Sequence, residues 1–205
     1  MPSDYRVQTI DNKLRSRIYG SRRGSAFTPT AFLDLGGRAA VDKALSRLAA
    51  KGTIRRLARG LYEYPRTHPE LGMLSPDIDQ VAKALAGKDR IRLQPAGAYA
   101  TNLLGLSEQV PAKVVFLTDG PSRIVKIGRQ EIQLRHTTTR NMATAGRLSG
   151  LLAQALRHLG KNHMNRARVQ HLKRTLPLKE RQQLLKDLRL VPAWMHTLFR
   201  QLAEE

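Results

Sequence analysis

Three arginines, Arg55, Arg56 and Arg59, stand close together in a short run that reads as two strands around a turn. Gly60 suits the turn because glycine accepts a positive φ at no steric cost. Guanidinium groups form two-pronged hydrogen bonds with phosphate oxygens and also enter narrow minor grooves. A surface hairpin needs only polarity, whereas here the nearest acid along the run is Glu63. The pattern therefore predicts a hairpin that contacts a polyanion.

The segment before this hairpin predicts a helix over residues 38–51 with two distinct faces. Its inward face is an apolar stripe at i, i+4 and i+7, formed by Val41, Leu45 and Leu48. The opposite face and the N-terminal edge carry the residues expected to contact base edges: Arg38, Ala39, Lys43, Ser46 and Arg47. Arginine and lysine donate to guanine, serine serves several bases, and alanine permits close approach. On this helix alone, an ordinary solvated face explains the two cations equally well.

The elements before this helix complete a recognisable order. Thr28 and Pro29 predict a helix start at which the threonine hydroxyl caps free N–H groups, and the Leu-Gly-Gly run at 35–37 ends that helix. An earlier helix over residues 4–19 is predicted from an apolar stripe at Val7, Ile10, Leu14 and Ile18. Helix, turn, helix and basic hairpin in sequence indicate a winged helix-turn-helix, a DNA-binding module.

Composition supports a nucleic-acid partner. The 205 residues carry a formal net charge of +20, the isoelectric point is about 11.3, and there is no cysteine. A field of this sign favours DNA, RNA or an anionic membrane. The membrane is the weakest choice, because no apolar run approaches the roughly 18 residues that a spanning helix needs, and no signal peptide is visible. Without cysteine or paired histidines we expect no metal, no cofactor and a cytoplasmic location.

Two domains are predicted within an overall α+β fold. Residues 65–74 contain two prolines and a glycine and are predicted to be a linker. Residues 1–64 then form the winged helix-turn-helix domain, and residues 75–205 form a second α+β domain with a small sheet and a helical C-terminal tail. Ser75 is the expected N-cap of that domain's first helix. Trp194 begins an apolar stripe and is expected in the core of the tail.

The second domain has its own basic run. Residues 120–174 contain twelve basic residues and one acid, Glu131. We predict a second anionic contact rather than only a solvated surface, with three arginines of the alternating strands sharing one face. The residues expected there are Arg123, Lys126, Arg129, Arg135, Arg166, Arg168, Lys173 and Arg174. The anion remains open: more operator DNA, a nucleic acid of another kind, or the acidic face of a protein.

Catalytic signatures are missing from the sequence. Neither the phosphate-binding glycine loops nor the G-x-S-x-G elbow occurs. The nearest nuclease-like pattern combines Asp119 with Glu131, but such a core needs a lysine where Gln133 stands. We therefore expect no catalytic residues and no enzymatic activity. A nuclease is kept as an alternative that divalent-metal-dependent cleavage would reveal.

Several motifs also match a known family. They are Ser16-Arg17-Ile18-Tyr19-Gly20, Phe27-Thr28-Pro29, the run from Ala44 to Tyr62, Asn102-Leu103-Leu104-Gly105-Leu106-Ser107 and Leu117-Thr118-Asp119-Gly120-Pro121. In these motifs the chain resembles AbiEi-type antitoxins of bacterial abortive-infection systems. The resemblance implies a winged domain that binds inverted repeats in its operon's promoter and represses it. It also implies a C-terminal domain that helps to neutralise a nucleotidyltransferase-like toxin, with direct contact between the two left open.

The sequence thus predicts a sequence-specific DNA-binding transcriptional autorepressor that acts as an antitoxin. Its expected partners are double-stranded operator DNA and a nucleotidyltransferase-like toxin, with no membrane. The alternative is an RNA- or toxin-binding module that uses the basic second domain without sequence-specific DNA readout. Salt dependence and preference among DNA sequences and RNA separate the two.

Overall fold

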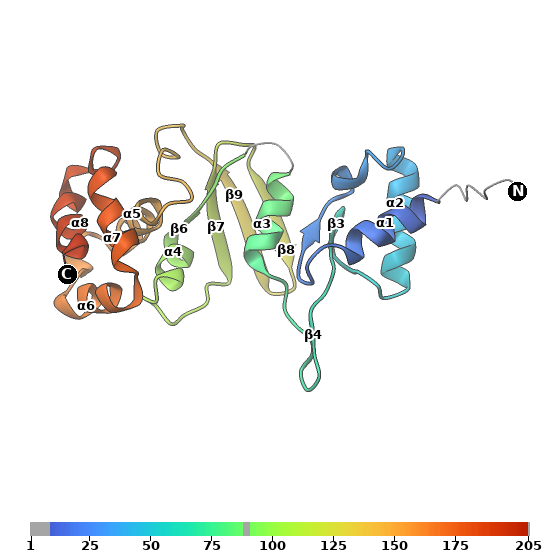
Figure 1. The fold of residues 1–205 in the computed structure, drawn as a ribbon, viewed down its shortest axis with the longest axis horizontal. Helices are drawn as coiled ribbons and strands as arrows, with labels where there is room; N and C mark the ends of the chain where they lie inside the picture. The colour runs from blue at the N-terminus through green and yellow to red at the C-terminus, as the bar shows by residue number, and fades with distance from the viewer. Residues whose placement is uncertain (1–8, 88–90, 205) are drawn as a thin grey trace, which may run out of the picture. The chain divides into compact units, whose positions relative to one another are not determined.

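The computed structural model describes residues 9–87 and 91–204, and the chain divides into two compact units between residues 89 and 90 (Figure 1). Unit 1 comprises residues 1–89 and unit 2 comprises residues 90–205. Both units mix helices with small sheets, so the fold is α+β as predicted. The division lies later than the predicted linker at 65–74, because the helix that follows this segment packs with unit 1.

Unit 1 has the element order of a winged helix. Its elements are α1 (Ile10–Tyr19), β1 (Ala26–Phe27), the 3-10 helix η1 (Pro29–Phe32), α2 (Arg38–Ala50), β2 (Arg55–Ala58), β3 (Leu61–Glu63), β4 (Thr67–His68), β5 (Gly72–Met73) and α3 (Ile78–Ala86). Strands β1, β3 and β2 form an antiparallel sheet with β3 in the centre. The short helix η1, the turn and α2 form the helix-turn-helix, and the β2–β3 hairpin is the wing.

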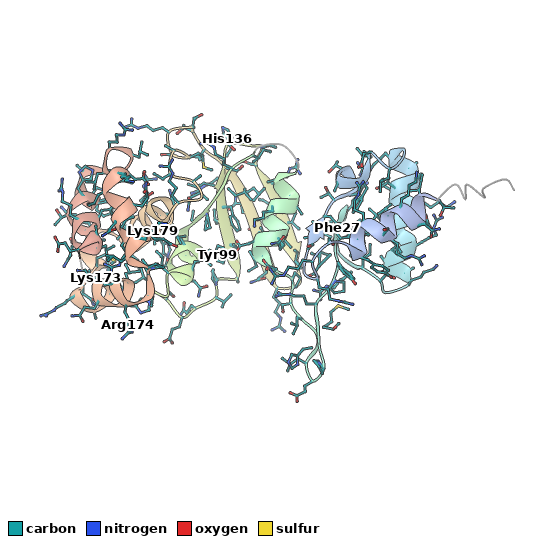
Figure 2. All side chains as sticks on the ribbon, viewed as in Figure 1. Phe27, Tyr99, His136, Lys173, Arg174 and Lys179 are labelled. Atoms are coloured by element: carbon teal, nitrogen blue, oxygen red, sulfur yellow. The ribbon has the colours of Figure 1, made fainter. Side chains whose placement is uncertain are left out.

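The core of unit 1 follows the apolar stripes read from the sequence. Leu14 and Ile18 of α1 are buried against Val41 and Leu45 of α2, which confirms the inward faces of both helices. Val7, the first member of the α1 stripe, lies outside the described residues. Aromatic rings from the sheet close this core, and Phe27, labelled in Figure 2, meets Phe32 edge-on with 5.2 Å between ring centroids. The packing fixes which side of α2 faces solvent.

The caps of two helices differ from the prediction. The Thr28 hydroxyl does not cap η1, because it is hydrogen bonded to the hydroxyl of Thr30 at 2.7 Å. Helix α3 begins after Asp77 rather than Ser75, since the Asp77 carboxylate accepts hydrogen bonds from the backbone N–H of Asp79 and of Gln80. A carboxylate at this end also interacts favourably with the helix dipole, which a serine hydroxyl does not match.

The predicted linker is itself a small hairpin. Strand β4 pairs with β5 in antiparallel register, with Thr67 opposite Met73 and His68 opposite Gly72. Gly72 has φ of +68°, which permits the tight return of the chain. Helix α3 then packs against β1, and its Val81 and Ala82 are fully buried. The prolines and the glycine therefore mark a turn inside unit 1 rather than the boundary between domains.

Unit 2 combines one sheet with a helical half. Its elements are β6 (Leu93–Ala96), α4 (Gly97–Leu103), β7 (Lys113–Thr118), β8 (Arg123–Ile127), β9 (Gln130–His136), α5 (Leu148–Leu159), η2 (Lys161–His163), α6 (Arg166–Thr175), α7 (Leu178–Lys186), η3 (Leu188–Leu190), η4 (Ala193–Met195) and α8 (His196–Ala203). The strand order is β6-β7-β9-β8, and only the β7–β9 pair is parallel. The small sheet and helical tail agree with the predicted architecture.

Two apolar regions hold unit 2 together. On one face of the sheet the buried Phe116 contacts Tyr99 of α4, which Figure 2 labels, with 5.4 Å between ring centroids. In the helical half, Met195 and Phe199 are fully buried among residues of α5, α6 and α7. Trp194 is 37 % exposed, so its predicted core position is wrong. The buried stripe instead begins one residue later and runs through Met195, Phe199 and Leu202.

Candidate nucleic-acid interface

Helix α2 presents one polar face to solvent. Its buried side, which includes Val41 and Leu45, orients Ala39, Lys43 and Ser46 outward, and all three are exposed. These are three of the five positions that the sequence assigned to base contacts. Among the described residues, Lys43 has no ion pair and no side-chain hydrogen bond, so its ammonium is free to meet an anion. A small residue, a hydroxyl and a cation on one face suit close approach to base edges.

The two arginines that flank this face are paired with acids. Arg38 donates from Nε to Asp42 Oδ2 at 2.8 Å, one turn along the same helix. Arg47 forms two hydrogen bonds with the Asp11 carboxylate of α1, one of them from Nε at 2.9 Å. Both arginine side chains remain about half exposed. A nucleic acid would have to compete with these carboxylates, which sequence reasoning had not counted.

Two of the three wing arginines are exposed, as the sequence predicts. Gly60 has φ of +69° in the β2–β3 turn, and Arg56 and Arg59 are exposed, as a hairpin that reaches for phosphate requires. Arg55 is different. Its Nε donates to Glu63 Oε2 at 2.9 Å, and its Nη2 donates to the carbonyl of Leu74 at 2.8 Å.

The surroundings of Arg55 explain its role. The Glu63 side chain is only 1 % exposed, and it would be a buried, uncompensated charge without this arginine. The bond to Leu74 also holds the segment between β5 and α3 against the wing. The expectation that Arg55 joins the tip with Arg56 and Arg59 is therefore wrong, because its guanidinium is committed to the interior of unit 1.

The cations predicted on the unit 2 sheet do not share one face. In the β8–β9 register, Arg123 lies opposite the buried Leu134, whereas Lys126 lies opposite Glu131. Neighbouring residues of a strand point to opposite faces, so Arg123 lies on the other side of the sheet from Arg135. Arg129 occupies the turn between the two strands. The alternation read from the sequence placed these arginines together, but the register separates them.

The remaining predicted cations lie on α6, away from the sheet edge. Arg166 and Arg174 are exposed, whereas Lys173 is half-buried, and Figure 2 labels it beside Arg174. Arg168 donates from Nη1 to the carbonyl of His163 at 2.5 Å. Figure 1 shows α6 and β8 at opposite ends of unit 2. The eight residues predicted to form the second anionic contact therefore do not form one continuous surface.

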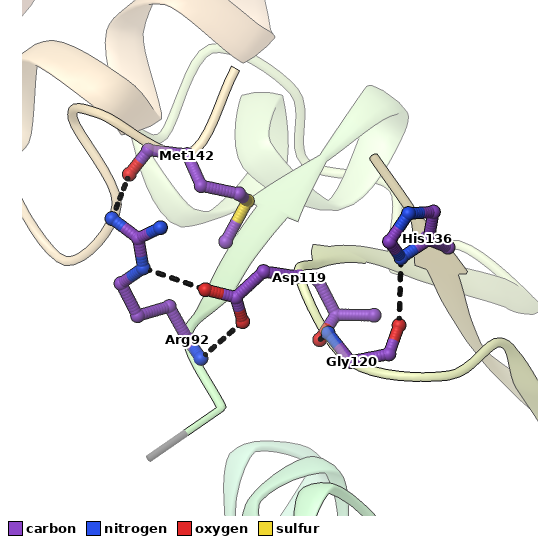
Figure 3. A network of polar contacts seen from close by, with 6 residues as sticks. Arg92, Asp119, Gly120, His136 and Met142 are labelled. Atoms are coloured by element: carbon purple, nitrogen blue, oxygen red, sulfur yellow. Dashed lines mark hydrogen bonds and ion pairs between the residues drawn. The ribbon is translucent and has the colours of Figure 1, made fainter. Parts of the chain in front are cut away.

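The carboxylates of the nuclease alternative do not meet. Asp119 follows β7 and accepts hydrogen bonds of 2.8 Å from both the backbone N–H and the Nε of Arg92 (Figure 3). These bonds hold the pKa of Asp119 below its ordinary value. Glu131 lies opposite Lys113, at the other end of β7, and pairs with its ammonium at 3.6 Å. Asp119 lies six residues after Lys113, and six residues of strand span about 20 Å, too far for one metal site.

Metal clusters and membrane-spanning helices are both absent from the part of the chain that the structure describes. Over residues 9–87 and 91–204, no group of three or more histidine, aspartate or glutamate side chains could hold a metal ion. In the same ranges, no helix has the length and apolar content needed to cross a bilayer.

Comparison with known proteins places the chain in a family. The family model described as "Family of unknown function (DUF6088)" matches residues 10–184. The chain belongs to the DUF6088 family. The match covers both units but carries no statement of activity or partner. A search among curated proteins finds no match.

A solved structure of another protein is similar to this member of the DUF6088 family. It is the crystal structure of the RV2827C protein from Mycobacterium tuberculosis, with 15 % sequence identity and a TM-score of 0.46. The similarity covers 99 % of this chain and 85 % of that chain.

Proposed function

We propose that unit 1 binds double-stranded DNA, with the exposed face of α2 reading base edges and the wing contacting the backbone. The observation that carries the proposal is that Lys43 lies beside Ala39 and Ser46 on the one face of α2 that packing leaves open. Arg56 and Arg59 in the same unit supply phosphate contacts that do not depend on sequence. A rigid helix that offers few, specific polar groups is suited to readout in the major groove.

We further infer a regulatory role from the resemblance to AbiEi-type antitoxins. On this proposal the protein is a cytoplasmic autorepressor that binds inverted repeats upstream of its own operon and acts as an antitoxin. A nucleotidyltransferase-like toxin would be its second partner. The support is the set of shared motifs together with a winged helix at the position where those antitoxins are expected to bind DNA. The proposal includes no catalytic activity and no cofactor.

The rival function uses unit 2. Lys126 and Arg135 lie on one exposed side of the sheet, and Arg166 and Arg174 are exposed on α6. These cations favour a contact with RNA or with an acidic protein surface that needs no base readout in DNA. Such a module would bind polyanions with a steep salt dependence and little preference among sequences.

A competition experiment separates the two functions. Fluorescence anisotropy with a labelled duplex from upstream of the coding sequence gives the dissociation constant, and unlabelled scrambled DNA and an RNA duplex serve as competitors. The proposal expects the upstream duplex to bind at least about a hundredfold more tightly than either competitor near physiological salt. Equal competition by scrambled DNA would remove sequence-specific readout, and stronger competition by RNA would favour the rival.

A further inference from the structure

Unit 2 contains a cavity of about 420 Å³ bordered by three arginines. Arg140 comes from the segment between β9 and α5, Arg157 from α5 and Arg189 from η3. Its volume lies within the roughly 300–1,000 Å³ of small-molecule sites. The three residues are far apart in the sequence, so only the fold brings them to one hollow.

The charge around this cavity is unbalanced. No acidic residue is among the described residues that line it. In the same part of the chain, none of the three guanidinium groups takes part in a hydrogen bond or an ion pair. All three arginines are exposed at the mouth of the hollow, and a bound anion would offset the repulsion between their like charges. Arginine presents a planar fork that fits phosphate in particular.

Buried polar contacts hold the backbone that carries these arginines. Asp187 is 2 % exposed and accepts hydrogen bonds from Arg147 Nη1 at 2.7 Å and from Ser149 Oγ at 2.5 Å. These bonds join the start of α5 to the turn that leads into Arg189. Arg92 donates to the carbonyl of Met142 at 3.1 Å and so fixes the segment that carries Arg140 (Figure 3). The cavity is therefore preorganised, which lowers the entropic cost of binding.

The rest of the lining indicates what kind of anion fits. Val191 and Pro192 form an apolar wall, while Gln154 and Thr144 are buried polar residues at the same cavity. Cations beside an apolar wall and a few amide or hydroxyl groups suit a molecule with a phosphate and a flat apolar part. A nucleic-acid strand instead needs an extended groove that follows its backbone. The hollow thus matches a compact ligand better than a polymer.

We propose that this cavity binds a small phosphorylated ligand of mononucleotide size, with Arg140, Arg157 and Arg189 holding the phosphate. This site is separate from α2 and the wing, and it does not depend on the proposed DNA binding. Unit 2 would then respond to a soluble metabolite while unit 1 contacts DNA.

Isothermal titration calorimetry on the full chain tests the proposal. The probes are AMP and GMP, with adenosine and guanosine as phosphate-free counterparts. At least one mononucleotide is expected to bind with a stoichiometry of one, and its nucleoside is expected not to bind detectably. Quenching of the single tryptophan, Trp194, two residues after Pro192, provides a second readout.

Variants locate the binding. Arg157→Gln and Arg189→Gln should each weaken mononucleotide binding about tenfold, because each removes a charge-assisted hydrogen bond. The matched control is Arg200→Gln on α8, which is also exposed but does not line the cavity. Unchanged unfolding midpoints show that the variants remain folded. A single-stranded DNA 12-mer is titrated in the same way as a polymer probe. The proposal is overturned if neither mononucleotide binds, or if Arg157→Gln and Arg189→Gln bind a mononucleotide as tightly as Arg200→Gln does. It is also overturned if the 12-mer alone binds and its binding depends on Arg157.

Discussion

The wing and the β8–β9 hairpin are built from similar sequences but present different surfaces. Each is an antiparallel pair closed by a turn in which glycine has a positive φ, +69° at Gly60 and +59° at Gly128. Each has an arginine beside that glycine. In the wing, one buried carboxylate engages Arg55 and leaves the remaining arginines exposed on the unit that carries α2. In β8–β9, Lys126 lies opposite Glu131 and the register divides the other cations between two faces.

This difference shows that the number of basic residues in a hairpin does not determine what it can bind. The position of the nearest acid and the pairing register decide which charges reach solvent together. On the proposed function the wing would contact phosphate, whereas β8 is an edge strand of its sheet.

The largest expected effect concerns the extent of the unit that carries the wing. A fragment of residues 1–74 lacks α3, whose Val81 and Leu85 are buried. Burial of these two side chains is worth about 4 kcal/mol, so this fragment should be less stable by that amount than a fragment of residues 1–89. Urea unfolding of both fragments measures the difference. Equal stability of the two fragments would indicate that the domain boundary lies at residues 65–74 and that α3 does not belong to the same unit as the wing.

Removal of Arg55, which pairs with the buried Glu63, should have the next largest effect on stability. Arg55→Ala leaves Glu63 buried without a partner and should lower the free energy of unfolding by about 3 kcal/mol. Arg56→Ala, one residue away and exposed, should change it by less than about 0.5 kcal/mol. Chemical denaturation of the two variants is the measurement. A fully stable Arg55→Ala protein with weakened DNA binding would show that Arg55 contacts DNA.

The two hairpins should differ in their contribution to DNA binding. Arg56→Ala and Arg59→Ala should each weaken binding to operator and scrambled DNA alike. Each should also reduce the slope of log affinity against log salt by about one unit, as expected for one lost phosphate contact. Arg129→Ala in the β8–β9 turn is the matched change and should leave the slope unchanged. A reduced slope for Arg129→Ala would give both hairpins the same role.

The smallest expected effect concerns the flank of α2. Exposed ion pairs contribute about 0.2–1 kcal/mol, so Asp11→Ala should barely change stability while releasing Arg47. Affinity for any duplex should then rise a few-fold. Arg47→Ala in the Asp11→Ala background should abolish the gain. If affinity stays constant in both variants, Arg47 is not within reach of bound DNA.

Local patterns predicted the helices better than they predicted the side-chain partners. The inward face of α2 followed from the spacing of Val41, Leu45 and Leu48, because helical periodicity alone decides which side of a helix is apolar. The partner of Arg55 did not follow from the turn. Counting back from a regular two-residue turn pairs Glu63 with Arg56, whereas an irregularity between Arg56 and Ala58 shifts the register and places Arg55 opposite Glu63.

Contacts between residues far apart in the chain could not be predicted from the sequence. The Arg47–Asp11 pair joins residues 36 positions apart, and neither residue type nor spacing indicates it. The cavity arginines come from three separate elements that only the packing of unit 2 brings together. By contrast, the Arg38–Asp42 pair has i, i+4 spacing and was readable once the helix had been identified.

The most direct test of the central claim is the affinity of Lys43→Ala for operator and scrambled duplexes, measured side by side with Lys83→Ala as an exposed control on α3. If α2 reads base edges, Lys43→Ala should weaken operator binding by about 1–3 kcal/mol and should change scrambled binding much less. Lys83→Ala should leave both affinities unchanged. An equal loss on both duplexes, or no loss on either, would contradict readout by this face of α2.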